Sequence, residues 1–116
     1  MIFQRSGKRL SSLARASISQ AFAGDALLKD ISVTGCRLEH TALIDVKTGE
    51  KYQLTIKPES IAKIGEFTLT VEARWVQSAN FNCEAGFLVV ESPKGKLFQR
   101  YVDYLDFKSD GTGPSL

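Results

Sequence analysis

Two short segments near the start of the chain combine residue types that suit an anionic, hydrogen-bonding ligand. In the first, R-S-G-K-R, Arg5 and Arg9 lie four residues apart with no acidic residue between them. In the second, D-I-S-V-T-G, Asp30 and Ser32 precede Gly35. Arginine is permanently charged and presents a planar fork of donors, which fits phosphate oxygens and the O6 and N7 edge of guanine. Together the two segments predict a receptor for a planar anion rich in acceptors, such as a purine nucleotide.

The carboxylate, the hydroxyl and the glycine of the second segment each have a chemical use. Asp30 and Ser32 occupy alternate positions at a predicted strand end, so both side chains leave the same face of the sheet. The carboxylate can accept from guanine N1–H and N2–H₂ or orient an arginine, and the hydroxyl can donate to a phosphate or cap the following turn. Gly35 permits a positive φ and a close approach of a ligand to backbone amides.

Each of these residues also has a purely structural interpretation. Arg5 and Arg9 are alternatively solvated charges on a disordered arm. Asp30 and Ser32 are alternatively a side-chain-capped turn between two strands that ends at Gly35. One segment alone does not decide between these interpretations, because R-x-x-x-R and D-x-S both occur often by chance.

Other polar and aromatic residues could contribute to a site or to its surroundings. Arg37 and Arg74 are expected to be solvated charges at its rim or additional ligand-binding residues. Trp75 is in register with Phe67 in an alternating segment, so core packing is its first expected role. His40, the only histidine, has no carboxylate or cysteine at a spacing typical of a metal or catalytic site.

The size and charge of the chain indicate a single domain with a local positive field. At 116 residues, 43% of them hydrophobic, the chain is long enough for one modest core. The net charge of +2 is too small for nucleic-acid binding over the whole surface, but residues 1–24 contain four basic residues and no acidic one. Cys36 and Cys83 form no metal or redox motif and are expected to be buried thiols in a reducing cytoplasm.

Most of the chain alternates apolar and polar residues as β-strands do. Between residues 67 and 75 the odd-numbered residues are apolar and the even-numbered ones are polar. Ser92 as an N-cap and Pro93 at the first helical position then predict a helix. An all-β fold follows, a small barrel of six antiparallel strands with the C-terminal helix packed on it. The strands are expected at about 14–22, 26–32, 35–39, 52–57, 67–75 and 83–89.

The basic, acid-poor start of the chain has a second interpretation. Residues 3–22 are rich in Arg and Ser and carry apolar residues at helical spacing, as an organellar transit peptide does. No secretory signal is visible, and no run approaches the roughly 18 apolar residues of a membrane span. We therefore expect a cytoplasmic protein without a membrane span.

The combination of the two polar segments resembles the PilZ domain family. The signature of that family is R-x-x-x-R followed about twenty residues later by [D/N]-x-S-x-x-G, and here 21 positions separate Arg9 from Asp30. The E-A-G-F stretch at 84–87 and the C-terminal helix also fall where this family has its last strand and its helix. The resemblance implies a PilZ-like, split barrel over residues 1–108, with residues 1–12 as a flexible basic arm and residues 109–116 as a disordered tail.

The resemblance also implies a function, because this family consists of bacterial receptors for cyclic di-GMP. That second messenger has two guanines and two phosphates. By the resemblance, Arg5 and Arg9 fold over the ligand and meet guanine edges and phosphates. Asp30, Ser32 and Gly35 then line the barrel surface against the guanine and the ribose phosphate.

Further residues are possible ligand contacts by the same resemblance. Trp75 would flank the bound nucleotide, and Lys8, Arg37 and Arg74 are additional candidates. Gln4 occupies the position before the arginine motif, which in this family is thought to influence whether one or two ligand molecules stack in the site. The sequence therefore leaves the ligand stoichiometry undetermined.

Three functions are compatible with these observations. In the first, cyclic di-GMP orders the arm and a partner protein reads the changed surface. In the second, the domain is a nucleotide-independent protein-interaction adaptor. The third, a nucleic-acid-binding barrel, is disfavoured because the aromatic residues fall at inward positions instead of alternating with Lys and Arg on one face. No nucleophile–base pair, metal cluster or phosphate loop is visible, so neither an enzyme nor a cofactor or metal is expected.

Overall fold

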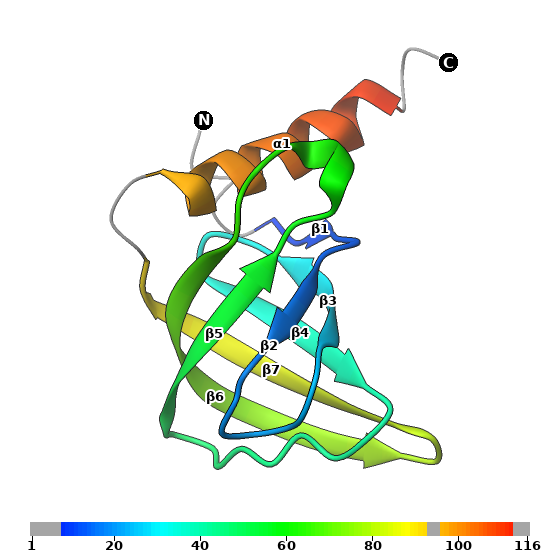
Figure 1. Cartoon of the computed structure of the whole chain (residues 1–116), viewed down its shortest axis with the longest axis vertical. Helices are drawn as coiled ribbons and strands as arrows, with labels where there is room; N and C mark the ends of the chain where they lie inside the picture. Colours follow the sequence, from blue (N-terminus) through cyan, green and yellow to red (C-terminus); the bar gives the residue numbers. More distant parts are fainter. Residues whose placement is uncertain (1–7, 93–95, 113–116) are drawn as a thin grey trace.

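The chain forms a closed β-barrel with one helix across one of its ends (Figure 1). The computed structural model describes residues 8–92 and 96–112, with helix side chains as far as Ser109. A short 3₁₀ helix (Ser60–Ala62) lies between the fifth and sixth strands. The strands and the α-helix within the described residues are β1 (Leu10–Ser11), β2 (Arg15–Ser17), β3 (Ala26–Ile31), β4 (Gly35–His40), β5 (Lys51–Lys57), β6 (Phe67–Ala79), β7 (Asn82–Glu91) and α1 (Leu97–Thr112).

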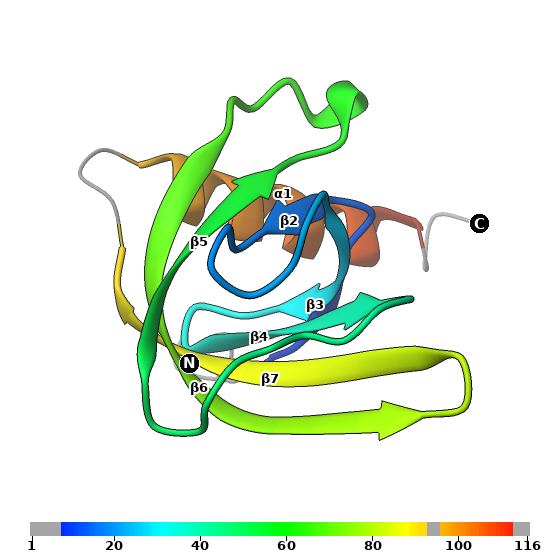
Figure 2. The same ribbon diagram turned by 60° about the horizontal axis from the view of Figure 1, so that its bottom comes forward.

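Six of these strands close the barrel. β3, β2, β5, β6, β7 and β4 follow one another as antiparallel neighbours, and the pairing of β3 with β4 joins the two ends of the circuit. β1 is an additional short strand that pairs with β3, with Leu10 opposite Ile31. Figure 2 shows this circuit with α1 behind it. The predicted six-stranded antiparallel barrel with a C-terminal helix is therefore confirmed.

The alternating residues predicted to point inward fill the barrel. In β6, Phe67, Leu69 and Val71 are buried while the residues between them are more exposed. The helix covers one end of the barrel, and the loop between β4 and β5 covers the other with the buried side chain of Ile44. Removing apolar side chains of this size from water contributes about 1.5–3 kcal/mol each, which makes this core the main stabilising term.

The strand predicted at 14–22 is shorter in the structure, and a second strand precedes it. β2 ends at Ser17, because the backbone N–H groups of Ala21 and Phe22 both donate to the carbonyl of Ile18 in a helical turn. β1 and β2 lie one after the other along β3. A strand followed by a helical turn explains why this part of the sequence shows both the alternation of a strand and the apolar spacing of a helix.

The described end of the predicted flexible arm is held against the barrel. Leu10 and Ser12 are buried, and the Ser12 hydroxyl lies 2.8 Å from the hydroxyl of Tyr101 on α1. Lys8 forms an ion pair of 3.2 Å with Asp106 on the same helix. The arm boundary at residue 12 is therefore wrong, because pairing with β3 and packing under α1 fix residues 10–12. Residues 10–18 contribute to the core, which favours the strand interpretation of this segment over a transit peptide.

The helix begins and ends later than predicted. The N–H of Arg100 donates to the carbonyl of Lys96, and the helix starts at Leu97. The predicted first helical position, Pro93, lies outside the described residues. The start coincides with the first residues of the apolar face, whose packing contributes more to a helix than its capping does. The helix continues to Thr112, so the tail predicted from 109 starts four residues too early. Adding residues to an existing helix requires no new nucleation.

Both cysteines are buried free thiols, as expected. Among the residues that the structure describes, no helix is both long enough and apolar enough to cross a membrane. Within the same residues, no three side chains of the metal-binding types gather into a group that could hold an ion.

Candidate functional site

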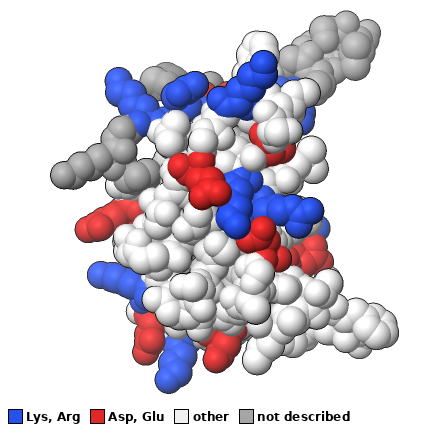
Figure 3. Space-filling model, in the orientation of Figure 1, with Lys and Arg blue, Asp and Glu red and all other residues white. Residues whose placement is uncertain are grey.

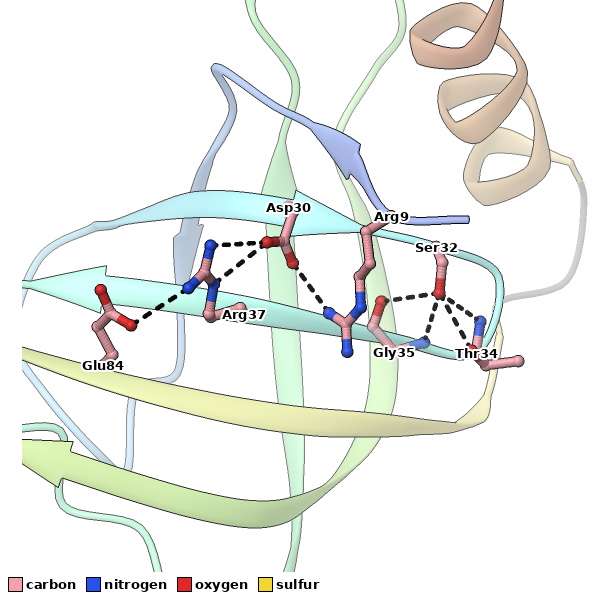
Figure 4. Close-up of polar contacts among 7 residues, drawn as sticks. All are labelled: Arg9, Asp30, Ser32, Thr34, Gly35, Arg37 and Glu84. Atoms are coloured by element: carbon pink, nitrogen blue, oxygen red, sulfur yellow. Dashed lines mark hydrogen bonds and ion pairs between the residues drawn. The ribbon is translucent and has the colours of Figure 1, made fainter. Parts of the chain in front are cut away.

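The D-I-S-V-T-G segment forms the end of β3, a tight turn and the first residue of β4. The hydroxyl of Ser32 accepts hydrogen bonds from the N–H groups of Thr34 and Gly35, at 3.2 and 3.3 Å, and lies 3.1 Å from the Thr34 hydroxyl. The Ser32 residue is 1% exposed. Its hydroxyl therefore caps the turn, which is the structural alternative that the sequence left open, and Figure 4 shows its contacts directed into the turn.

Gly35 is required here by a close backbone approach. A Cβ atom at this position would lie 2.6 Å from the carbonyl oxygen of Phe87 on β7. The left-handed conformation expected at Gly35 is not found, because within the described glycines only Gly24 and Gly49 have a positive φ. The glycine therefore lets β4 pack closely against β7 beside the turn, where Gly35 itself is buried.

Asp30 is the centre of a chain of ion pairs on the outer face of β3, β4 and β7 (Figure 4). Its Oδ1 accepts from Nη1 of Arg9 at 2.9 Å. Its Oδ2 accepts from Nε and Nη2 of Arg37, at 3.1 and 2.9 Å. Arg37 also reaches Glu84, with 3.5 Å between Nη1 and Oε1. The carboxylate is thus held from two sides by arginine, and the predicted pairing of the two motifs is present in the described residues through Arg9 and Asp30.

Trp75 leaves the core because β6 contains a β-bulge. Ala73 pairs with Phe87 and Trp75 pairs with Gly86, so Arg74 is an extra residue between them. A bulge shifts the alternation by one residue and directs the following side chain to the other face. Trp75 is accordingly 39% exposed, so its expected core position is wrong. Its indole lies over Gly86, where an added Cβ would come within 2.2 Å of Nε1.

A shallow pocket of about 350 Å³ lies beside these residues. This volume falls in the range of small-molecule sites, roughly 300–1,000 Å³. The pocket has two arginines, one indole and no acidic side chain in its lining, so it favours an anion with an aromatic part. The lining residues are Arg9, Thr34, Gly35, Arg74, Trp75, Gly86, Phe87 and Leu88.

The structure thus brings together most of the predicted site residues that it describes. Arg9, Gly35, Arg74 and Trp75 line one pocket, and Asp30 and Arg37 are connected to it through Arg9. Lys8 is directed elsewhere, to Asp106 on α1. The predicted ligand-binding residues Gln4 and Arg5 lie outside the described residues.

Glu84 and Gly86 are parts of this site that the sequence interpretation did not assign. Both belong to the E-A-G-F stretch of β7, which resembles the last strand of the PilZ family and is assigned no ligand contact by that resemblance. Glu84 lies opposite Glu39 across β4 and β7, and Gly86 lies opposite Arg37. Counting alternate outward positions along β7 would have placed both on the face that carries Arg37.

Cys36 lies directly beneath this surface, and its buried thiol has low reactivity. It pairs with Ile31 on one side and Phe87 on the other. Burial raises the pKa of its thiol from 9.0 to about 12, while the nearby Arg9 lowers that pKa and Asp30 raises it. A thiol with such a pKa remains protonated at neutral pH and is a poor nucleophile.

A larger hollow of about 410 Å³ lies between the segment Arg9–Leu13 and the end of α1, with Glu59 and Lys108 in its lining. The Tyr101 hydroxyl donates to Oε1 of Glu59 at 2.7 Å, and burial raises the pKa of Tyr101. Only Arg9 among the predicted site residues reaches this hollow. The smaller pocket is therefore the better candidate site, because four predicted site residues line it.

Comparison with known proteins supports the fold. No family model matches the chain, and no curated protein matches it. Among solved structures, the chain is similar to the Bacillus subtilis inhibitor of motility (MotI/DgrA), with a TM-score of 0.70 and 16% sequence identity. The similarity covers 89% of this chain and 49% of that protein, so the chain spans about half the length of its structural neighbour. At this level of identity, the similarity shows a shared fold.

Proposed function

We propose that this chain is a bacterial, cytoplasmic effector domain that binds cyclic di-GMP and signals to a partner protein. The observation that carries the proposal is the pocket in which Arg9, Gly35, Arg74 and Trp75 meet without an acidic lining residue. Cyclic di-GMP combines flat bases with anionic phosphates, and the pocket offers an indole and two guanidinium groups. The name of the structurally similar protein, an inhibitor of motility, also describes a regulator and not an enzyme.

In the proposed complex, each group has a separate role. A guanine stacks on the indole of Trp75, an interaction worth about 1–3 kcal/mol per base. Arg9 and Arg74 bind the phosphates or the O6 and N7 edge of a guanine. Thr34 and Gly35 line the pocket beside the expected position of the ribose phosphate, and Ser32 acts by fixing the turn that contains them.

Arg9 would exchange its partner when the ligand binds. In the free protein, Arg9 pairs with Asp30, and the arginine side chain is 53% exposed. An exposed ion pair of this kind is worth only about 0–1 kcal/mol, so transfer of Arg9 to a phosphate costs little. Arg37 keeps hold of Asp30 through two donors, and the freed Oδ1 can accept from guanine N1–H and N2–H₂.

The N-terminal arm provides the last contacts in the proposed complex. Arg5 belongs to the same motif as Arg9, and we expect it to close over the ligand from the side opposite the barrel. Ordering the arm costs on the order of 1–2 kcal/mol per residue, while each charge-assisted contact contributes about 1.5–3 kcal/mol. Lys8 and Gln4 adjoin this contact, and calorimetry would give the stoichiometry that Gln4 leaves undetermined.

Isothermal titration calorimetry with cyclic di-GMP tests this function, with GMP and cyclic di-AMP as ligand controls. We expect binding of cyclic di-GMP alone, and at least tenfold weaker binding, about 1.4 kcal/mol, for Arg9→Ala. Arg100→Ala, on the exposed face of α1, is the matched control and should bind as the wild type does. The absence of binding heat at about 50 µM folded protein would contradict the proposal, since the expected dissociation constant is micromolar or lower. The nucleotide-independent adaptor would then be the better interpretation.

A further inference from the structure

The last part of β6 is a sheet edge without a neighbour on one side. β5 pairs with β6 as far as Glu72, and the backbone of Ala73 still bonds to Gly49 and Glu50. Beyond Ala73, residues 74–79 pair only with β7 within the described part of the chain. Figure 2 shows this stretch as the outermost strand, with no strand on the side away from β7.

The edge presents unpaired backbone groups at two positions. Ala79 and Asn82 pair across a turn of two residues, and such a turn is closed by a hydrogen-bonded pair. Hydrogen-bonded and non-hydrogen-bonded pairs alternate along an antiparallel ladder, so Gln77 also bonds to β7. Val76 and Ser78 therefore direct their N–H and C=O groups away from β7, and neither forms a backbone hydrogen bond outside its strand pairing within the described residues.

This edge lacks the features that normally keep a free strand from pairing. Free edges are usually protected by charged residues, prolines or a covering loop, but residues 75–82 contain no Lys, Arg, Asp, Glu or Pro. Phe81 at the hairpin tip is 89% exposed, and Val76 is also exposed. Figure 3 shows the protruding end of the molecule, at the lower right, as largely uncharged surface.

We propose that this edge binds the same edge of a second copy of the chain, as two antiparallel strands related by a two-fold axis at Gln77. In this register, Val76 of one copy lies opposite Ser78 of the other, and the outward N–H and C=O groups of the two residues can form reciprocal hydrogen bonds. Arg74 lies opposite Asn80 of the other copy, so no like charges face each other. In this register, the outward backbone groups of Val76 and Ser78 in both copies form hydrogen bonds, and no side chains of like charge lie opposite each other.

In the two-fold register, Gln77 of one copy lies opposite Gln77 of the other copy. The register can therefore be tested by placing like or opposite charges at this position. Gln77 faces Gln77 of the second copy in a non-hydrogen-bonded pair, where side chains are closest. Like charges placed directly opposite are destabilising and unlike charges are favourable. We therefore expect the wild type to be a dimer at about 200 µM, and both Gln77→Lys and Gln77→Glu to be monomers. An equimolar mixture of the two variants should form a dimer again.

Sedimentation equilibrium of the ligand-free protein measures these states. Gln99→Lys and Gln99→Glu make the same charge changes on the exposed face of α1 and should remain dimers, while circular dichroism confirms that each variant folds. A wild type that is monomeric at this concentration overturns the proposal and leaves the edge to a strand from another protein. A mixture that stays monomeric overturns the two-fold register. These outcomes do not depend on nucleotide, so they are separate from the test of cyclic di-GMP binding.

Discussion

At the scale of single residues, Arg37 determines where the carboxylate of Asp30 can be. It donates twice to Oδ2 of Asp30 and once to Glu84, so the carboxylate is fixed whether or not Arg9 is bound to it. Arg37 does not line the pocket. It is therefore a positioning residue for the proposed ligand contact of Asp30.

This role predicts a non-additive effect of two substitutions. We expect Arg37→Ala to weaken cyclic di-GMP binding about five- to tenfold, about 1–1.4 kcal/mol, because Asp30 loses its fixed orientation. In an Asp30→Ala background, the same change should have no further effect, since residues that act through one another are coupled. Calorimetry on the four proteins of this cycle measures the coupling. Additive losses would show that Arg37 contacts the ligand independently of Asp30.

Gly86 allows the indole of Trp75 to lie against β7, because glycine has no Cβ that would occupy the same space. We expect Gly86→Ala to displace Trp75, because the new Cβ would lie 2.2 Å from Nε1 and 2.4 Å from Cε2 of the ring. Trp75 is the only tryptophan, so its fluorescence reports this movement directly. Emission should move to longer wavelength, and binding of cyclic di-GMP should weaken at least about fivefold as stacking is lost. Gly65→Ala is the control, since a Cβ there meets no atom within 4 Å. Unchanged emission and affinity in Gly86→Ala would contradict the stacking role.

At the scale of elements, β4 supports the site from below. Its residue Cys36 is fully buried between β3 and β7, directly under Asp30 and Arg9. Because burial raises the pKa of this thiol to about 12 from 9.0, the unfolded chain loses the proton at a lower pH than the folded protein does. The resulting stability is fully present below pH 9 and is lost as the pH rises towards 12.

This linkage predicts a measurable fall in stability above pH 9. The free energy of unfolding should decrease by up to about 1.4 kcal/mol per pH unit between pH 9 and pH 10. Cys36→Ala should be less stable at neutral pH but should lack this part of the decline. Urea unfolding at pH 8, 9 and 10, followed by circular dichroism, gives the comparison. An equal decline in both proteins would mean that another group causes it.

The helix is the other element that bears on the site. α1 holds β1 through Tyr101 and Ser12, and it holds the arginine motif through the ion pair of Asp106 with Lys8. Asp106 is 3% exposed, so this pair is screened less by solvent than the pair of Arg9 with Asp30. The helix therefore fixes the motif at Lys8, whereas the neighbouring Arg9 pairs with Asp30 and not with the helix.

At the scale of the whole molecule, the sequence predicts the barrel better than it predicts the exposed site. The alternation in β6 as far as Ala73 follows directly from burial, and so the start of the strand was correctly predicted, although β6 continues to Ala79, four residues beyond the predicted end. The position of Trp75 could not be obtained this way, because the bulge at Arg74 depends on how β6 pairs with β7 and leaves no mark in the alternation. The structural reason for Gly35 could not be obtained from the sequence either, since its close contact with Phe87 comes from a strand distant in sequence.

The distribution of charge over the molecule also explains how a chain of net charge +2 could bind an anion. Arg9 and Arg74 line the pocket together with no acidic side chain, and their acidic partners, Asp30 at 2.9 Å and Glu72 at 3.9 Å, lie outside this lining. Binding of cyclic di-GMP should therefore depend on a local field that salt screens. The Debye length falls from about 10 Å at 0.1 M to about 3 Å at 1 M ionic strength.

The salt dependence of binding provides the last test. We expect the dissociation constant for cyclic di-GMP to rise about three- to tenfold between 50 and 500 mM NaCl, because Arg9 and Arg74, the two arginines proposed to bind the phosphates, are exposed to solvent. The rise should be moderate, since salt also weakens the competing pair of Arg9 with Asp30, which lies at 2.9 Å in the free protein. Arg74→Ala should reduce this dependence, and Asp30→Ala should increase it by removing the competing pair. Calorimetry at four salt concentrations measures the slopes, and a dissociation constant that does not change with salt would contradict binding of the phosphates by arginine.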